Sequence, residues 1–268
     1  MNFPLSSASH IPRKRFGQHF LHDKNILRRI VEAVSPRASD VLVEIGPGEG
    51  ALTFPLLQAA GKLIAIELDR DLIEPLRARA APIGELTIVS RDVLSVDFGA
   101  LAAGARVRVV GNLPYNISTP ILFHCLDHAN AIEDMHFMLQ KEVVERMAAG
   151  PGSKTYGRLS VMLQLRCTVE PLFGVPPGAF RPPPKVDSAV VRLVPLAPAD
   201  LPQADFGLIA RLVRAAFGQR RKTLTNALRE FASAEQLAAA GIDPRARAEQ
   251  LAPATFVALA QWLSARPD

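Results

Sequence analysis

The sequence Asn-Leu-Pro-Tyr at residues 112–115 follows directly on an apolar run. Pro114 cannot donate a hydrogen bond to a sheet ladder, so a strand must end here. The side-chain oxygen of Asn112 and the main-chain carbonyl of Leu113 could accept hydrogen bonds from the exocyclic amine of an adenine, on which the ring of Tyr115 could stack. These bonds would draw N6 toward tetrahedral geometry and aim its lone pair at a methyl donor. By themselves, the same residues are also those of a turn that closes a strand.

A second group of residues predicts the methyl donor. The stretch 44–50 reads Glu-Ile-Gly-Pro-Gly-Glu-Gly, and Gly46 and Gly48 allow a tight turn and a close approach to a ligand. The spacing also fits a dinucleotide fingerprint. However, an acidic residue two positions before the first glycine and a third glycine at the end are typical of S-adenosylmethionine sites. Glu67 and Asp92 follow the next two apolar runs, where they could bind the ribose hydroxyls and the adenine amine of that cofactor.

Helix-like and strand-like segments alternate around these groups, which predicts βαβ crossovers and a parallel sheet. We therefore expect an α/β fold, a doubly wound (Rossmann-like) sheet, in which ligands bind outside the carboxyl ends of the strands. The glycine turn at 44–50, Glu67, Asp92 and the turn at Asn112 would all lie at that edge of the sheet. The expected strands are 40–46, 62–69, 85–92, 106–112 and 134–140, and the expected helices are 25–34, 51–61, 70–80, 119–129 and 141–150.

The pattern changes after residue 150. Two further strands, 167–175 and 187–196, are expected on either side of a proline-rich connection, 176–186, that should be stiff and exposed. The remainder has apolar residues at helical spacing. We place one boundary near residue 200, with a catalytic, cofactor-binding domain over 1–200 and a small all-helical domain that contacts RNA or the ribosome over 201–268.

Charge and composition narrow the class of partner and the compartment. The chain has 268 residues, of which 49% are hydrophobic, and a net charge of +5 with basic clusters at 13–15, 28–29 and 220–222. Clustered Lys and Arg indicate a polyanionic partner, although a slightly basic, solvated surface would look similar. No apolar run reaches the roughly 20 residues of a membrane span, and there is no secretory signal. We expect a cytoplasmic protein with no membrane partner.

Cysteines and histidines suggest neither a disulfide nor a metal. The two cysteines, Cys125 and Cys167, lie in apolar surroundings and are read as reduced thiols. His124 and His128 are four residues apart on an expected helix, a spacing that can bind a metal. No zinc motif accompanies them, so no metal is expected.

With these residues in place, the chain resembles the bacterial small-subunit rRNA adenine dimethyltransferases, whose loss gives kasugamycin resistance. The resemblance runs from about residue 13 to 231. It rests on the stretches KRFGQHFL (14–21), VEIGPGEGALT (43–53), NLPYNISTP (112–120), LQKEVVERM (139–147), YGRLSV (156–161), FRPPPKVDSAVVRL (180–193) and FGQRRKTLTNAL (217–228).

The resemblance implies S-adenosylmethionine as methyl donor and N6,N6-dimethylation of two adjacent adenosines in the hairpin loop near the 3′ end of 16S rRNA, in ribosome biogenesis. Asn112, Leu113, Pro114 and Tyr115 would then hold the target base, Phe180 would add a second aromatic face, and Arg220, Arg221 and Lys222 would contact RNA phosphates. The residues implied to contact the cofactor are His19, Leu21, Gly46, Gly48, Glu67, Asp92 and Asn112.

One position departs from the family pattern. The N-terminal motif often reads Gln-Asn-Phe-Leu, and His19 stands here at the asparagine. If the contact is made through the backbone, function is retained; if the asparagine amide is needed, cofactor binding is weakened.

Three alternatives stay open. A DNA adenine methylase usually carries Asp/Ser/Asn-Pro-Pro-Tyr and a separate sequence-reading domain, and this sequence has neither. The large-subunit rRNA adenine methylases of macrolide resistance share much of the first domain. An assembly factor that mainly binds pre-ribosomal particles is the third alternative.

Overall fold

The computed structural model describes residues 19–102, 104–219 and 221–265. They form two compact units, one from residues up to 141 together with 172–192, the other from 142–171 together with 193 onward. The expected single boundary near residue 200 differs from this division, because residues 142–171 group with the C-terminal helices. The chain therefore passes between the units more than once, which a boundary drawn along the sequence does not capture.

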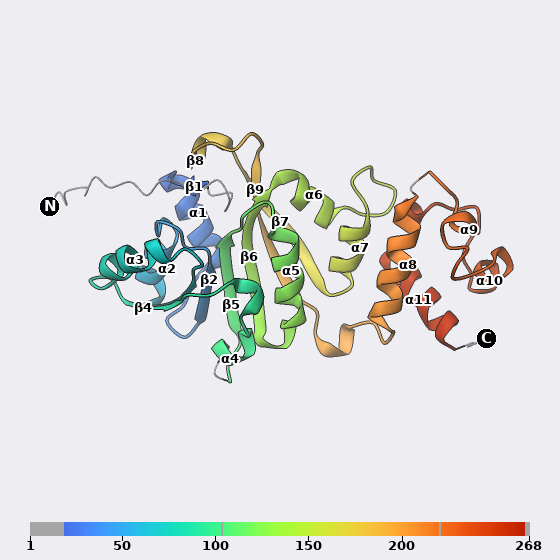
Figure 1. Cartoon of the computed structure of the whole chain (residues 1–268), viewed down its shortest axis with the longest axis horizontal. Helices are drawn as coiled ribbons and strands as arrows, with labels where there is room; N and C mark the ends of the chain where they lie inside the picture. Colours follow the sequence, from blue (N-terminus) through green and yellow to red (C-terminus); the bar gives the residue numbers. More distant parts are fainter. Residues whose placement is uncertain (1–18, 103, 220, 266–268) are drawn as a thin grey trace. The chain divides into compact units, whose positions relative to one another are not determined.

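Seven strands form the main sheet (Figure 1), most of which belongs to the first unit. Their order is β4-β3-β2-β5-β6-β9-β7. The pairs β2–β3, β3–β4, β2–β5 and β5–β6 are parallel, as the alternation of helices and strands predicts. The strands are β2 Val41–Ile45, β3 Lys62–Ile66, β4 Glu85–Val89, β5 Val107–Asn112, β6 Ile132–Gln140, β7 Cys167–Val175 and β9 Ser188–Pro195.

The strand order reverses between β2 and β5. The chain adds β3 and β4 on one side of β2, then returns to place β5 and β6 on the other side. Ligands of doubly wound folds bind at such a switch point, outside the carboxyl ends of the strands. Here those ends carry the glycine turn after β2 and Asn112 at the end of β5.

The strands are apolar because both of their faces are covered. Every residue of β5 before Asn112 is buried, as are the last four residues of β2. The covering helices also follow local signals: α1 (Lys24–Val34) begins at Asp23, whose carboxylate accepts from the main-chain nitrogens of Asn25 and Ile26. The other helices of this unit are α2 Thr53–Ala60, η2 Arg70–Leu72, α3 Ile73–Ala80, η3 Val93–Ser95, α4 Phe98–Ala102, α5 Ser118–Asp127, η4 Ala129–Ala131 and η5 Pro177–Ala179.

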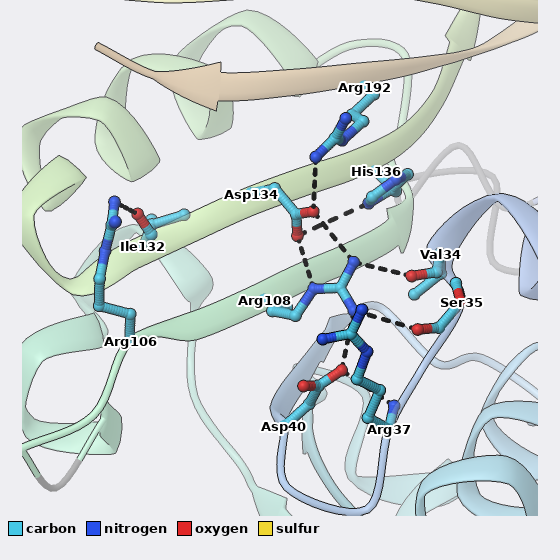
Figure 2. A network of polar contacts seen from close by, with 10 residues as sticks. All are labelled: Val34, Ser35, Arg37, Asp40, Arg106, Arg108, Ile132, Asp134, His136 and Arg192. Carbon is cyan, nitrogen blue, oxygen red and sulfur yellow. Dashed lines mark hydrogen bonds and ion pairs between the residues drawn. The ribbon is translucent and has the colours of Figure 1, made fainter. Parts of the chain in front are cut away.

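A buried network of ion pairs and hydrogen bonds around Arg108 connects the C-terminus of α1 with the sheet (Figure 2). Arg108 of β5 donates two hydrogen bonds, of 2.9 and 3.0 Å, to the carboxylate of Asp134 on β6. It also donates to the carboxylate of Asp40 at 2.8 Å and to the main-chain oxygen of Val34 at 2.7 Å. Because the guanidinium satisfies a carbonyl at the C-terminus of the helix, α1 is held against β5 and β6.

A second, two-stranded sheet was not expected from the sequence. β1 (Phe20–Leu21) pairs antiparallel with β8 (Phe180–Arg181), so that Leu21 lies opposite Phe180. The proline-rich connection 176–186 is therefore not exposed throughout, since Ala179 and Phe180 are buried in its middle. This pairing brings residues 19–21 to the main sheet, where they can line a site.

Helices make up most of the second unit, in agreement with the expected all-helical C-terminal segment. Within it, the hydroxyl of Tyr156, which is fully buried, donates to the main-chain oxygen of Leu251 at 2.8 Å. Across the described residues, no helix is long and apolar enough to cross a membrane. The helices are α6 Lys141–Ala148, α7 Arg158–Gln164, η6 Pro198–Asp200, α8 Phe206–Gly218, α9 Leu224–Ala227, α10 Ala234–Ala239, η7 Ala248–Gln250 and α11 Pro253–Ser264.

Candidate active site

A cavity of about 370 Å³ opens at the carboxyl ends of β2, β3 and β5. Its lining contains every residue that the sequence assigned to the methyl donor and to the turn after β5. The structure thus brings together groups that are spread over some hundred residues of sequence. These residues are His19, Leu21, Gly46, Gly48, Glu67, Asp92, Asn112, Leu113, Pro114 and Tyr115.

The glycine turn after β2 needs glycine for two different reasons. Gly46 and Gly48 have φ angles of +68° and +56°, which other residues rarely adopt. A Cβ on Gly48 would lie 2.9 Å from the ring of Phe20, so this glycine lets β1 pack against the turn. At Gly46 a Cβ would meet no atom within 4 Å, so the main chain there faces open space. A ligand can therefore approach the backbone of Gly46 closely.

Glu67, directly after β3, is buried and bonded to the same turn. One carboxylate oxygen accepts from the main-chain nitrogen of Gly48 at 3.2 Å, and the other accepts from that of Asp69 at 2.8 Å. Burial raises the pKa of this carboxyl group, whereas the two backbone hydrogen bonds lower it; burial is the larger effect. Glu67 therefore supports the glycine turn as well as lining the cavity.

Asp92 lies beyond the end of its strand. β4 ends at Val89, and Asp92 begins the short helix η3, with its carboxylate accepting from the main-chain nitrogen of Leu94 at 3.0 Å. The side chain is exposed and lines the cavity. Its place at the rim agrees with the sequence expectation, although a turn rather than the strand itself carries it there.

Glu44, the second-last residue of β2, was noted in the sequence as a mark of S-adenosylmethionine sites but was not assigned to the site. It lines the cavity, is 2% exposed, and its Oε2 has no hydrogen-bond partner among the described residues. Burial raises its pKa to about 8. The group is therefore mostly protonated at pH 7, and a ligand that carries positive charge, as S-adenosylmethionine does, would favour its ionised form.

His136 of β6 is a further lining residue that sequence reasoning did not assign to the site. Its ring is buried, and burial lowers its pKa to about 4, so that the ring is neutral at pH 7. Its Nδ1 lies 3.8 Å from the carboxylate of Asp134 (Figure 2), and neither ring nitrogen has a hydrogen-bond partner in the described part of the chain. Nothing in its local sequence distinguishes this histidine from an ordinary core residue.

The amide of Asn112 is oriented by the N-terminal segment. Its Nδ2 donates to the main-chain oxygen of His19 at 3.0 Å. Because the nitrogen of the amide is used in this way, its oxygen is left as the acceptor for a ligand. The next residue, Leu113, donates its main-chain nitrogen to the oxygen of Met138 at 3.1 Å, which turns the chain toward β6.

Tyr115 is half-buried and is held by two contacts. Its hydroxyl lies 2.6 Å from the Oγ of Ser188, and its ring is stacked on that of His19 with 5.7 Å between the centroids. The His19 ring is itself bonded through Nδ1 to the main-chain oxygen of Pro182 at 2.7 Å. Burial raises the pKa of the Tyr115 hydroxyl, so that the phenol stays protonated at neutral pH.

Phe180, the expected second aromatic face for the base, does not line this cavity: its side chain is 2% exposed and packs in the core with Leu21 and Val190, which does not support that role. Arg221 and Lys222 are exposed residues of the second unit, just before α9. Arg220 lies outside the described residues.

The histidine pair of α5 has protein partners. His124 is bonded through Nε2 to the main-chain oxygen of Val96 at 2.9 Å, and His128 lies 3.4 Å from the carboxylate of Asp97. Over the described ranges, no group of three His, Cys, Asp or Glu side chains could hold a metal ion. That no metal is needed stays a prediction.

Two solved structures that superpose on most of this chain are RNA methyltransferases or adenosine methyltransferases by name. A dimethyladenosine transferase from Plasmodium falciparum superposes with a TM-score of 0.78 at 28% identity, covering 90% of this chain and 96% of that one. The 23S rRNA methyltransferase ErmE superposes with a TM-score of 0.70 at 26% identity, covering 91% and 99%. The protein is thus a Rossmann-like methyltransferase with a C-terminal helical region.

Its sequence defines the family more narrowly. Residues 9–265 match the ribosomal RNA adenine dimethylase family, and the chain belongs to that family. Two relatives, each 66% identical over 255 residues, come from Xanthomonas euvesicatoria pv. vesicatoria and Xanthomonas axonopodis pv. citri. Each is called ribosomal RNA small subunit methyltransferase A, and the alignments cover 95% of this chain and 97% of each relative.

Proposed function

We propose that the protein transfers methyl groups from S-adenosylmethionine to N6 of two adjacent adenosines in the hairpin loop near the 3′ end of 16S rRNA, dimethylating each. The observation that carries this proposal is the orientation of Asn112, whose amide nitrogen is bonded to His19 and whose oxygen is left for an adenine amine. The small-subunit relatives at 66% identity support the choice of RNA.

The residues around the glycine turn fit the cofactor. Gly46 offers open backbone, Glu67 a carboxylate for the ribose hydroxyls, and Asp92 an acceptor at the rim for an adenine amine. Glu44 offers a buried carboxyl group near which positive charge is favoured. When bound, S-adenosylmethionine supplies a methyl group attached to a positively charged sulfur.

Asn112 and Leu113 would hold the amine of the target adenine. With N6–H groups donating to the Asn112 Oδ1 and to the Leu113 carbonyl, the nitrogen lone pair is turned away from the ring and toward the methyl group. S-adenosylmethionine held in the cavity would supply the methyl carbon, which would pass from sulfur to N6, and the proton on the cationic nitrogen would then be released to water. No side chain has to act as a base, and the rate gain comes from positioning.

Tyr115 would stack on the target base and hold it in line. Its raised pKa keeps the hydroxyl protonated, so that it takes no part in proton removal. Since the base of a paired or stacked nucleotide cannot reach this cavity, the RNA has to present a loop nucleotide turned out of its stack.

The second unit would contact the RNA backbone. Arg221 and Lys222 are exposed, and with Arg220 they form the basic cluster that the sequence predicts as a phosphate anchor. We propose the helical C-terminal segment, residues 201–268, as the RNA- or ribosome-contacting part. An assembling small ribosomal subunit in the cytoplasm is accordingly the proposed partner.

Incubation with labelled S-adenosylmethionine and under-methylated small subunits, followed by mapping of the modified nucleotides, tests the proposal. Two adjacent N6,N6-dimethyladenosines near the 3′ end of 16S rRNA are expected. Label confined to the large-subunit RNA would favour the activity in the name of ErmE. Tight particle binding with no label in adenine would instead favour an assembly factor.

A further inference from the structure

The hydroxyl of Tyr115 is held by a residue that has no role in the reaction described above. Its partner, Ser188, is 0% exposed, lies 73 residues later in the sequence and is the first residue of β9. We infer that Ser188 is a positioning residue for methyl transfer, because its hydroxyl fixes the direction in which the Tyr115 ring, on which the target base stacks, extends from the main chain. This inference rests on the proposed function.

The position of Ser188 is set by the main sheet. β9 is a neighbour of β6, and the main-chain oxygen of Asp187 accepts from the nitrogen of Lys141 at 2.9 Å, where β6 ends. The main chain on both sides of Ser188 is therefore held: Asp187 before it by a hydrogen bond, and β9 after it by its place in the sheet. A hydroxyl on such a support can hold a partner within a narrow range of positions.

Tyr115 needs such a support because its own backbone lies in a turn. Residues 115–117 form this turn between β5 and α5, and the hydroxyl of Ser118 donates to the main-chain oxygen of Tyr115 at 3.3 Å. The turn fixes the Cα end of the side chain, and Ser188 fixes the hydroxyl end. With both ends held, χ1 cannot change without breaking a contact, and the stack on the His19 ring restricts rotation of the Tyr115 ring about its own axis.

The base must lie in line with the methyl group, and small displacements of a reactant lower the rate strongly. A ring that is free at its hydroxyl end would sample tilted positions and would carry the base with it. Loss of the Ser188–Tyr115 hydrogen bond should therefore slow methyl transfer while leaving the cavity for the cofactor unchanged. A role of Ser188 in strand packing alone would not depend on the Tyr115 hydroxyl.

A double-mutant cycle separates these two roles. Ser188→Ala and Tyr115→Phe each remove one partner of the bond, and each is expected to lower the single-turnover methylation rate of under-methylated small subunits by about 10-fold. The double variant should be no slower than either single variant. Cofactor affinity, measured by calorimetry, should stay within about 2-fold of the wild type. Ser160→Ala, at another fully buried serine, is the matched control and should leave the rate unchanged.

A spectroscopic readout reports on the ring directly. The chain has only two tyrosines, so 3-fluorotyrosine labelling yields two fluorine resonances, and Tyr115→Phe assigns them. Ser188→Ala should shift or broaden the resonance of Tyr115. The resonance of Tyr156, whose hydroxyl donates to Leu251 in the second unit, should not move.

Three results would overturn the inference: a fully active Ser188→Ala variant, a fully active Tyr115→Phe variant, or rate losses that multiply in the double variant. If Ser188→Ala lowers the melting temperature, Tyr115→Phe still tests the bond without altering the strand. If the proposed function itself is wrong, the wild-type protein will place no methyl group on adenine, a result that differs from the three above. In that event the fluorine resonance of Tyr115 continues to test the bond.

Discussion

The side-chain nitrogen of Asn112 lies 3.0 Å from the main-chain oxygen of His19, a residue 93 positions earlier in the sequence. Through this bond the segment that leads into α1 orients the amide at the end of β5. Because the donor is committed to His19, the acceptor side of the amide faces the ligand. The N-terminal segment is therefore part of the proposed base-binding site and not only of the cofactor site.

Replacement of Asn112 tests this arrangement. Asn112→Ala removes the acceptor for N6–H and is expected to lower the methylation rate by at least about 100-fold, because the adenine is no longer held in line. Binding to small subunits, measured by sedimentation, should stay near normal, since the basic cluster around Arg221 is unchanged. A loss of particle binding equal to the loss of rate would contradict separate roles for the two sites.

His19→Asn introduces the residue that the family pattern often has. The contact with Asn112 uses the main-chain oxygen of His19, so this variant is expected to bind S-adenosylmethionine within about 3-fold of the wild type. Calorimetric titration measures that affinity. A change of more than about 10-fold in either direction would mean that the side chain at this position contacts the cofactor.

The buried Glu44 predicts how stability depends on pH. Its folded-state pKa of about 8 is above the ordinary value of 4.5, so the folded state retains a proton that the unfolded state has lost. Stability is therefore lost as pH rises, and between pH 6.5 and 8 the free energy of unfolding should fall by about 2 kcal/mol from this group. His136 acts in the opposite direction in this window but by well under about 1 kcal/mol, because its pKa is about 4 in the folded state and 6.5 ordinarily, so that only the last part of its unfolded-state titration falls above pH 6.5.

Glu44→Gln serves as the control for that pH dependence. Glutamine keeps the shape of the side chain and cannot ionise, so the fall in stability between pH 6.5 and 8 should be absent. Urea unfolding at each pH measures both proteins. Equal slopes for the variant and the wild type would show that another group titrates in this range.

Neutralising the basic cluster tests the phosphate contacts. Changing Arg220, Arg221 and Lys222 to alanine should weaken binding to small subunits and reduce the slope of log affinity against log salt by about 2 to 3. Lys62→Ala, which removes an exposed charge at the start of β3, is the matched control and should leave the slope unchanged. An unaltered slope in the triple variant would remove the cluster from the RNA interface.

Much of the fold and of the candidate site could be predicted from the sequence because the signals are local. Strands covered on both faces read as apolar runs, as over residues 63–66 of β3, and the helix α2 ends before Gly61, as expected. Parallel strands place their carboxyl ends at one edge, so the sequence alone predicts that the glycine turn, Glu67 and Asn112 meet. The cavity lining bears out that juxtaposition.

Contacts between distant segments were decided only by the tertiary structure. Alternation along a strand shows which residues share a face but not what lies opposite, so Phe180 could be assigned to the base although its pairing with Leu21 buries it. The same holds for Ser188, which looks like an ordinary strand residue until β9 brings it to Tyr115. The sequence predicts which chemical groups lie at the edge of the sheet, because parallel strands end there. Packing between distant segments sets which of these groups are hydrogen-bonded, which are buried in the core and which line the cavity.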